Sequence, residues 1–121
     1  MEKTVLVVDD DPLMGELMEE ILSINHYHVL LAHDGVEAIN QTNRHHIDII
    51  LMDIRLPNFS GFWFCQALRH KKNTCNIPVV MVSAIMTDEN IHKARLAGAV
   101  GTVKKPFTSQ ELLTAVEKNS L

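Results

Sequence analysis

The chain has little of what several classes of protein require. Among its 121 residues are two cysteines, Cys65 and Cys75, which are too few for a disulfide framework and lack the Cys-x-x-Cys spacing of metal and redox motifs. The five glycines and four prolines are far fewer than a fibrous or low-complexity protein contains. We therefore expect an ordinary globular domain with reduced, structural thiols.

Long apolar stretches are also absent. The longest, residues 77–86, has ten residues and is interrupted by Pro78 and Ser83, so it is too short to cross a bilayer. The first apolar run, residues 5–8, is followed by three aspartates and not by the small residues of a signal-peptide cleavage site. We therefore expect no membrane contact and a cytoplasmic location.

Positive charge is in the minority. The chain has 11 Lys and Arg residues against 15 Asp and Glu residues, which gives a formal net charge of −4. Proteins that bind the phosphate backbone of nucleic acids usually carry the opposite charge, so direct nucleic-acid binding is not expected. With 46% hydrophobic residues the chain can bury a substantial core, and its length predicts a single domain over residues 1–121.

Five short apolar runs predict the strands of a sheet. They are rich in β-branched residues and mostly continuous, a pattern typical of strands buried on both faces of a parallel sheet. The runs are Val5–Val8, Val29–Ala32, Ile47–Met52, Val79–Val82 and Val100–Val103.

Helical patterns separate these runs. In residues 12–25, Leu13, Leu17, Ile21 and Ile24 recur at intervals of four, four and three, which predicts one apolar stripe on a helix. Five strand–helix units in a row favour an α/β three-layer sandwich with right-handed crossovers. The four later helices are predicted from a capping box at Asp34 and Glu37, from Ser60, from Asp88 to Ala97 before Gly98, and from a capping box at Thr108 and Glu111.

Polar residues follow four of the five strands, at the edge of a parallel sheet where binding sites form. Asp9–Asp11 follow the first run, Asp53 the third, Ser83 the fourth and Lys105 the fifth. Each of these residues alone has an ordinary explanation as a helix cap, a turn residue or a surface charge, and Asp11 is expected to cap the first helix. Together, at one edge, they predict a functional site.

The cluster of Asp9, Asp10 and Asp53 points to magnesium and phosphoryl chemistry. Three carboxylates at one sheet edge raise one another's pKa values unless a cation lies among them. Mg²⁺ prefers such hard oxygen ligands and often binds beside a phosphate. A carboxylate can attack phosphorus to form an aspartyl phosphate, while Lys105 neutralises charge and Ser83 donates a hydrogen bond to a phosphoryl oxygen.

Four strings of residues, each at a strand end, form a pattern that covers essentially the whole chain. They are Val7-Val8-Asp9-Asp10-Asp11-Pro12, Leu51-Met52-Asp53-Ile54-Arg55-Leu56-Pro57 with Gly61, Val82-Ser83-Ala84, and Lys105-Pro106-Phe107. In this order they resemble the receiver domain of two-component response regulators. The resemblance implies a doubly wound, flavodoxin-like sheet of five parallel strands in the order 2-1-3-4-5.

The resemblance also implies a role for each residue of the acidic cluster. Asp53 would accept a phosphoryl group from a phosphohistidine on a sensor histidine kinase or a phosphotransfer protein. Asp10 and Asp53 would bind Mg²⁺ directly, with the backbone carbonyl of Arg55 as a further ligand and Asp9 acting largely through water.

The same resemblance implies how the signal is received and passed on. Lys105 would contact the phosphoryl oxygens, and Ser83 would move toward them once Asp53 is modified. The bond between Lys105 and Pro106 is similar to one that is often cis in this family. The protein would regulate a downstream protein or output domain, as a monomer or a weak phosphorylation-dependent dimer, and would catalyse only its own phosphorylation and dephosphorylation.

One residue departs from the family's pattern. Receivers usually carry Tyr or Phe on the fifth strand, two or three residues before the lysine, and this aromatic residue rotates inward as the Ser or Thr moves. Thr102 occupies that position here. The resemblance therefore does not say how phosphorylation is reported at the surface of the fourth helix, fifth strand and fifth helix.

Three other functions fit the same fold. A degenerate receiver would act as a phosphorylation-independent interaction module, but the complete set of Asp9, Asp10, Asp53, Ser83 and Lys105 argues against it. A flavin-binding domain shares the topology, although three aspartates after the first strand would repel the flavin phosphate. An aspartate-nucleophile phosphatase would need a second acid two residues after Asp53, where this chain has an arginine.

The histidines and the aromatic residues 62–64 have ordinary explanations. Adjacent His45 and His46 point apart on a helix and have no third ligand at a supporting spacing, so we expect solvated side chains. Phe62, Trp63 and Phe64 are interpreted as core and rim residues, with a partner-binding patch at Trp63 as the alternative hypothesis.

Overall fold

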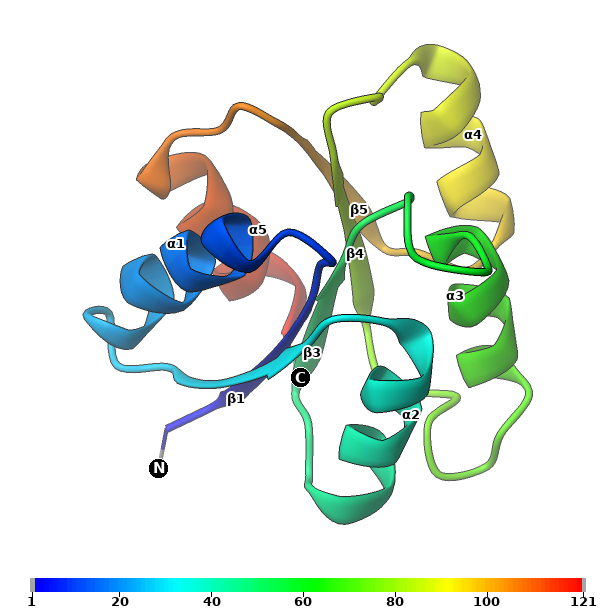
Figure 1. Cartoon of the computed structure of the whole chain (residues 1–121), viewed down its shortest axis with the longest axis horizontal. Helices are drawn as coiled ribbons and strands as arrows, with labels where there is room; N and C mark the ends of the chain where they lie inside the picture. The colour runs from blue at the N-terminus through cyan, green and yellow to red at the C-terminus, as the bar shows by residue number, and fades with distance from the viewer. Residues whose placement is uncertain (1, 121) are drawn as a thin grey trace.

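The computed structural model describes residues 2–120, in which five strands alternate with five helices. The strands form one parallel sheet in the order β2-β1-β3-β4-β5 (Figure 1), which confirms the doubly wound, flavodoxin-like α/β fold expected from the sequence. The strands are β1 (Thr4–Val8), β2 (His28–Ala32), β3 (Ile49–Met52), β4 (Val79–Ser83) and β5 (Gly101–Lys104), and the helices are α1 (Pro12–Ser23), α2 (Gly35–Arg44), α3 (Gly61–Arg69), α4 (Asp88–Leu96) and α5 (Ser109–Asn119).

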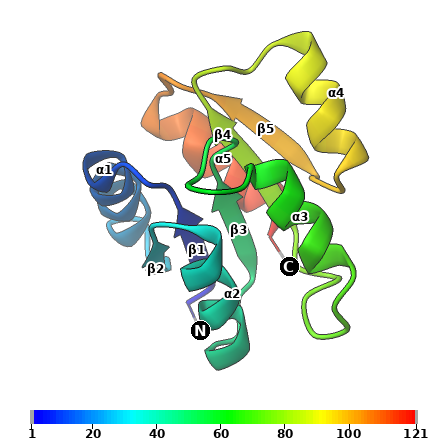
Figure 2. The same ribbon diagram turned by 45° about the vertical axis from the view of Figure 1, so that its right-hand side comes forward.

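The helices cover both faces of the sheet. α1 and α5 lie on one face, and α2, α3 and α4 lie on the other (Figures 1 and 2). Side chains along each strand alternate between two hydrophobic cores: Leu6 and Ile50 belong to the core under α2 and α3, whereas Val5 and Leu51 belong to the core under α1 and α5. Within residues 2–120, none of these helices is long and apolar enough to span a membrane.

α1 turns a different face to the sheet from the one expected. Met18 and Ile21 are buried, whereas Leu13 and Ile24 are 76% and 72% exposed, and Leu17 is exposed as well. The expected stripe is therefore wrong, apart from Ile21. The reason is that α1 carries apolar residues on two faces, and periodicity alone does not say which face meets the sheet.

The two expected capping boxes have different outcomes. At α5, Thr108 and Glu111 each accept a hydrogen bond from the other's backbone N–H, which confirms that box. At α2, Asp34 accepts from the Glu37 N–H, but the Glu37 carboxylate accepts from the His33 N–H instead of the Asp34 N–H. The box expected at α2 is therefore half formed, because the chain approaches this helix with the preceding N–H closer to the glutamate.

Strand boundaries differ from the expected ones by one or two residues. β3 begins at Ile49, and the preceding Asp48 joins the start of β3 to β1, since its N–H donates to the Thr4 carbonyl and its Oδ2 accepts from the Thr4 N–H. β5 is shifted by one residue toward the C-terminus. These shifts leave Asp53 and Lys105 directly after their strands, at the edge where a site was expected.

Candidate functional site

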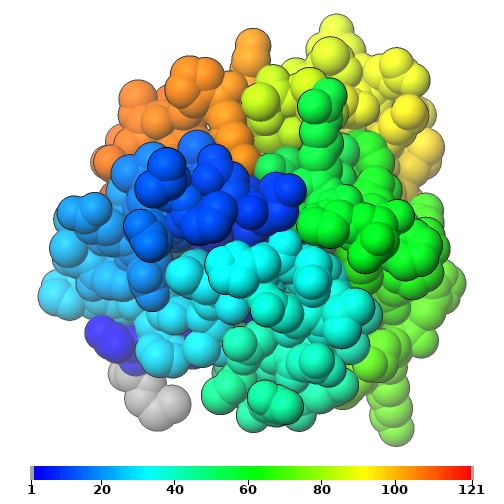
Figure 3. Space-filling model, viewed as in Figure 1, coloured from blue at the N-terminus to red at the C-terminus, as the bar shows by residue number. Residues whose placement is uncertain are grey.

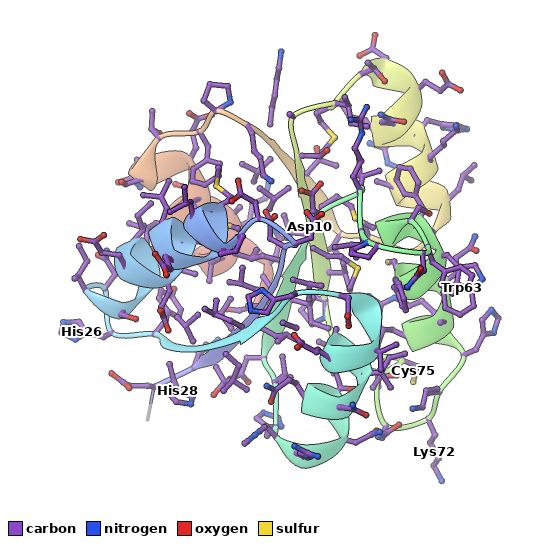
Figure 4. The ribbon with its side chains drawn as sticks, in the orientation of Figure 1. Asp10, His26, His28, Trp63, Lys72 and Cys75 are labelled. Atoms are coloured by element: carbon purple, nitrogen blue, oxygen red, sulfur yellow. The ribbon has the colours of Figure 1, made fainter. Side chains whose placement is uncertain are left out.

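Residues after β1 and β3 meet at one edge of the sheet. Carboxylate oxygens of Asp9, Asp10 and Asp53 lie within 4.8 Å of one another; Asp9 and Asp53 are buried and Asp10 is exposed. In the space-filling view, the blue segment after β1 borders the green segment after β3 (Figure 3), and Figure 4 shows Asp10 at this edge. The structure therefore brings together the three carboxylates that the sequence placed at separate strand ends.

Lys105 links the two buried carboxylates. Its Nζ lies 2.7 Å from Asp9 Oδ2 and 2.8 Å from Asp53 Oδ2, and its side chain is 13% exposed. The peptide bond between Lys105 and Pro106 is cis, as expected. One ammonium group from the segment after β5 therefore holds together the residues that follow β1 and β3.

Burial and hydrogen bonding together shift the pKa values of Asp9 and Lys105. Burial raises the pKa of Asp9 above its usual 3.8, and the hydrogen bonds from Lys105 and from the Asp11 N–H offset only part of that shift. Burial alone would lower the pKa of Lys105, but its hydrogen bonds to Asp53 and Asp9 outweigh burial and place that pKa above the usual 10.5. Lys105 is therefore a cation at neutral pH, and an additional cation near Asp9 would favour the ionised carboxylate.

Asp53 is also positioned by the segment that follows it. The Arg55 N–H donates to Asp53 Oδ1 at 3.2 Å. Gly61, the first residue of α3, packs on the Asp53 carbonyl so closely that a Cβ atom at Gly61 would lie 2.1 Å from that oxygen. The sequence pattern contains Gly61 but gives no sign of this contact, which depends on the path of the β3–α3 loop. The Arg55 carbonyl as a metal ligand stays a prediction.

Ser83 lies at the end of β4 and is 1% exposed. Its Oγ accepts a hydrogen bond from the Ile85 N–H at 3.3 Å, in the loop between β4 and α4. A serine hydroxyl can accept one hydrogen bond while it donates another. Ser83 is therefore tied to the β4–α4 loop, and it retains a donor for a new acceptor at the sheet edge.

Thr102, on β5, borders two hollows of the molecular surface. One hollow, of about 550 Å³, lies between β5 and α5 and is also lined by Ala115. The other, of about 70 Å³, lies between α4 and β5 and is lined by Ala94 and Ala99 as well. The surface is therefore hollowed on both sides of β5, and Thr102 borders each hollow.

The aromatic residues near the start of α3 divide between core and surface. Phe64 is buried, and its ring occupies the place where a side chain on Gly35 would lie. Phe59 and Trp63 are about half exposed and stack with their ring centroids 4.7 Å apart. Figure 4 shows Trp63 on the α3 side of the molecule, away from Asp10. This is the expected division into core and rim, and a partner-binding patch at Trp63 stays a hypothesis.

The adjacent histidines lie far from the acidic cluster, where α2 ends before β3 begins. Both His45 and His46 are exposed, as expected of solvated side chains. Nε2 of His46 lies 3.0 Å from Asp48 Oδ1, which ties this histidine to the segment before β3.

The acidic cluster fits a hard divalent cation. Asp9, Asp10 and Asp53 carry three negative charges when ionised, and Lys105 supplies one positive charge, which leaves two negative charges at the cluster. Carboxylate oxygens are the ligands that Mg²⁺ prefers. Because Asp10 is exposed, an ion can reach these oxygens from solvent.

Replacing Asp10 with Asn tests this charge balance. Without metal, we expect Asp10→Asn to unfold at a temperature about 2–6 °C higher than wild type, because a like-charge repulsion of about 1 kcal/mol is removed. With Mg²⁺ at about ten times its dissociation constant, wild type should gain about 1.4 kcal/mol from binding, and the variant should gain much less. Thermal unfolding followed by circular dichroism, with and without Mg²⁺, measures both effects.

The matched control for that variant is Glu16→Gln. Glu16 lies on the exposed side of α1, so its replacement removes the same charge outside the cluster and should preserve the full shift on addition of Mg²⁺. A shift of wild-type size in Asp10→Asn would contradict a metal site at this cluster.

Known proteins match this chain over nearly its whole length. A family model described as the response regulator receiver domain matches residues 5–117. The chain is 39% identical over 113 residues to hybrid signal transduction histidine kinase D of Dictyostelium discoideum, a match that covers 93% of this chain and 7% of that protein. It is 28% identical over 117 residues to the polar-differentiation response regulator DivK of Brucella ovis, with 97% and 95% of the two chains covered.

The fold is shared with solved structures of the same kind. The chemotaxis response regulator CheY4 of Vibrio cholerae superposes with a TM-score of 0.91 at 28% identity, and 98% of each chain is covered. The chain spans between 7% and 47% of the length of three curated relatives. Its similarity to those longer proteins therefore concerns one part of each of them.

Proposed function

The chain belongs to the family of response regulator receiver domains of two-component systems, and from this premise we propose that Asp53 accepts a phosphoryl group. The observation that carries the proposal is the contact of Lys105 Nζ with Asp53 Oδ2 at 2.8 Å, within a cluster of three carboxylates. A nucleophilic carboxylate, a cation and hard oxygen ligands at one sheet edge are the parts that phosphoryl transfer to a carboxylate needs.

The proposed donor is a phosphohistidine on a sensor histidine kinase or a phosphotransfer protein. An oxygen of Asp53 attacks the phosphorus atom, the bond between phosphorus and the histidine nitrogen breaks, and that nitrogen takes up a proton from water. The product is an aspartyl phosphate. Lys105, already within hydrogen-bond distance of Asp53, neutralises charge on the phosphoryl oxygens, and the Ser83 hydroxyl donates a hydrogen bond to one of them.

The proposed cofactor is Mg²⁺. Asp10, Asp53 and the carbonyl of Arg55 would hold the ion, with Asp9 acting largely through water. When bound, Mg²⁺ would neutralise charge on the transferred group. The chain itself keeps these ligands in place, because Lys105 and the Asp11 N–H hold Asp9 and the Arg55 N–H holds Asp53.

The proposed domain comprises residues 1–121 and phosphorylates and dephosphorylates only itself. It works in the cytoplasm and passes its state to a downstream protein or an output domain, as a monomer or a weak phosphorylation-dependent dimer. The net charge of −4 supports a protein partner over direct contact with nucleic acid.

Intact-mass measurement after incubation with acetyl phosphate and Mg²⁺ tests this proposal. We expect one phosphoryl adduct on wild type and none when a chelator removes Mg²⁺. No adduct, together with no binding of Mg²⁺, would favour a degenerate receiver that serves as a phosphorylation-independent interaction module. The contacts that join Asp9, Asp53 and Lys105 support the phospho-acceptor over that alternative.

Replacing Lys105 with Met should slow phosphorylation by acetyl phosphate about a hundredfold while the protein stays folded. The methionine keeps the apolar stem but removes the charge that meets the phosphoryl oxygens. The time course of the adduct by intact mass gives the rate, and far-UV circular dichroism checks the fold. Lys104→Met, which removes the exposed neighbouring charge, is the control and should keep the wild-type rate. A wild-type rate in Lys105→Met would remove this lysine from the mechanism.

The pH dependence of stability in Lys105→Met tests the contacts of Lys105 with the two buried carboxylates. Because the pKa of Lys105 is raised in the folded state, its stabilising contribution is complete below about pH 10.5 and is lost as the pH rises through the folded-state value. The free energy of unfolding of wild type should therefore fall more steeply above pH 10.5 than that of Lys105→Met. Urea unfolding at several pH values measures the difference.

A further inference from the structure

The loop between β4 and α4 is held from both sides at one residue, Ile85. The N–H of Ile85 donates to Ser83 Oγ at 3.3 Å, and the carbonyl of Ile85 accepts from Nδ2 of Asn90. Ser83 is the last residue of β4, and Asn90 lies in the first turn of α4. Two consecutive hydrogen bonds therefore connect the end of the strand to the start of the helix.

The side chain of Asn90 is not needed to cap α4. Thr87 is the N-cap residue, and its Oγ1 accepts from the Asn90 N–H at 3.1 Å while its carbonyl accepts from the Ile91 N–H at 2.9 Å. The Asn90 side chain instead reaches back five residues along the chain to Ile85. Its hydrogen bond thus fixes the position of the loop relative to α4, and the helix start is satisfied without it.

Among the helices, α4 buries the fewest of its described residues in the core. Among the described residues of α4, Ala94 alone is buried, whereas α3 buries four residues. Figure 2 shows α4 beside β5, the edge strand of the sheet. The hollow of about 70 Å³ between α4 and β5, which Thr102 helps to line, gives the helix room to shift.

We propose that Asn90 is a positioning residue that transmits the state of Ser83 to α4. This inference rests on the proposed function, since Ser83 turns only if Asp53 carries a phosphoryl group. When Ser83 Oγ moves to that group, the Ile85 N–H loses its acceptor and Ile85 shifts. The Ile85 carbonyl then pulls the Asn90 side chain with it through their hydrogen bond. As a result, the first turn of α4 moves toward the hollow beside Thr102. The response reaches α4 along the backbone of the loop and does not need an aromatic residue on β5.

Asn90→Asp is the variant that tests the connection. It keeps the size of the side chain but replaces the Nδ2 donor with an oxygen, which repels the Ile85 carbonyl. An acidic residue in the first turn also favours the helix, so α4 should remain formed. Amide hydrogen exchange of residues 84–96 is measured by mass spectrometry with and without beryllofluoride and Mg²⁺, where beryllofluoride stands in for the phosphoryl group. In wild type we expect exchange to change in both the loop and α4.

In Asn90→Asp, the change in α4 should fall to less than half of the wild-type change, while the change in residues 84–87 persists. The phosphoryl adduct formed with acetyl phosphate, measured by intact mass, should equal that of wild type. Asn90→Ala, which also removes the donor, should give the same loss. His92→Ala, an exposed position on the same helix, is the control and should retain the full response.

Two results would overturn the role of Asn90 and leave the proposed function intact. One is an α4 response of wild-type size in both Asn90 variants, and the other is a wild-type protein that forms the adduct but shows no change in α4. A wild-type protein that forms no adduct would overturn the proposed function, and this inference with it. The intact-mass measurement on wild type therefore separates the two failures.

Discussion

Replacing Asp53 with Asn should abolish the phosphoryl adduct. The amide has no anionic oxygen to attack phosphorus, so the loss should be complete and not partial. The variant should remain folded, because the side chain keeps its size at a position that is 9% exposed and the cluster loses one of its repelling negative charges. Intact mass after incubation with acetyl phosphate and Mg²⁺ gives the result, and far-UV circular dichroism checks the fold.

Asp34→Asn is the matched control for this experiment. Asp34 follows β2 at the same edge of the sheet and caps α2, and Asn caps a helix as well as Asp does. The control should therefore form the same adduct as wild type. A full adduct on Asp53→Asn that survives acid would instead indicate a phosphorylated hydroxyl group, and Asp53 would not be the acceptor.

The grouping of the acidic residues could be predicted because it depends on the topology of the sheet and not on the paths of individual loops. Continuous β-branched runs indicate a parallel sheet, and parallel strands all end at the same edge. β3 begins two residues later than its apolar run, yet Asp53 still follows its last residue, because the polar residue itself ends the strand. The order of the strands, in contrast, came from the resemblance to a family and not from periodicity.

Contacts that depend on the path of a loop could not be predicted in the same way. The hydrogen bond from Asn90 to Ile85 and the approach of Gly61 to Asp53 both join residues whose spacing in the sequence has no characteristic pattern. The prediction of which face of α1 is buried was wrong for a related reason. Two apolar stripes on one helix are equivalent until packing against the sheet selects one of them.

Replacing Gly61 with Ala should damage both the fold and the phospho-acceptor. The new Cβ would lie 2.1 Å from the Asp53 carbonyl oxygen and 3.1 Å from Ile54 Cα, and these backbone atoms cannot rotate away as a side chain can. The Gly61 N–H also donates to the Ile54 carbonyl at 2.6 Å, so α3 cannot move off without losing that hydrogen bond. We expect a loss of about 2–3 kcal/mol in the free energy of unfolding, measured with urea.

Two other glycines supply controls for the stability measurement. In Gly15→Ala, on α1, the Cβ would lie 3.9 Å from Leu31 Cδ2, which is ordinary contact, so the helix preference of alanine should stabilise the protein by up to about 1 kcal/mol. In Gly35→Ala, the Cβ would lie 1.8 Å from Cζ of Phe64, so this variant should lose stability without touching Asp53.

The rate of phosphorylation by acetyl phosphate then separates a general loss of stability from a displaced acceptor. Under conditions where each variant is folded, Gly61→Ala should react at least about tenfold more slowly than wild type, because its overlap is relieved only by moving the Asp53 backbone. Gly35→Ala should react at nearly the wild-type rate, since its overlap is with a side chain of the core. If Gly61→Ala matched wild type in rate, the start of α3 would merely pack against Asp53. A slow reaction confined to Gly61→Ala would mean that the start of α3 sets the position of the acceptor.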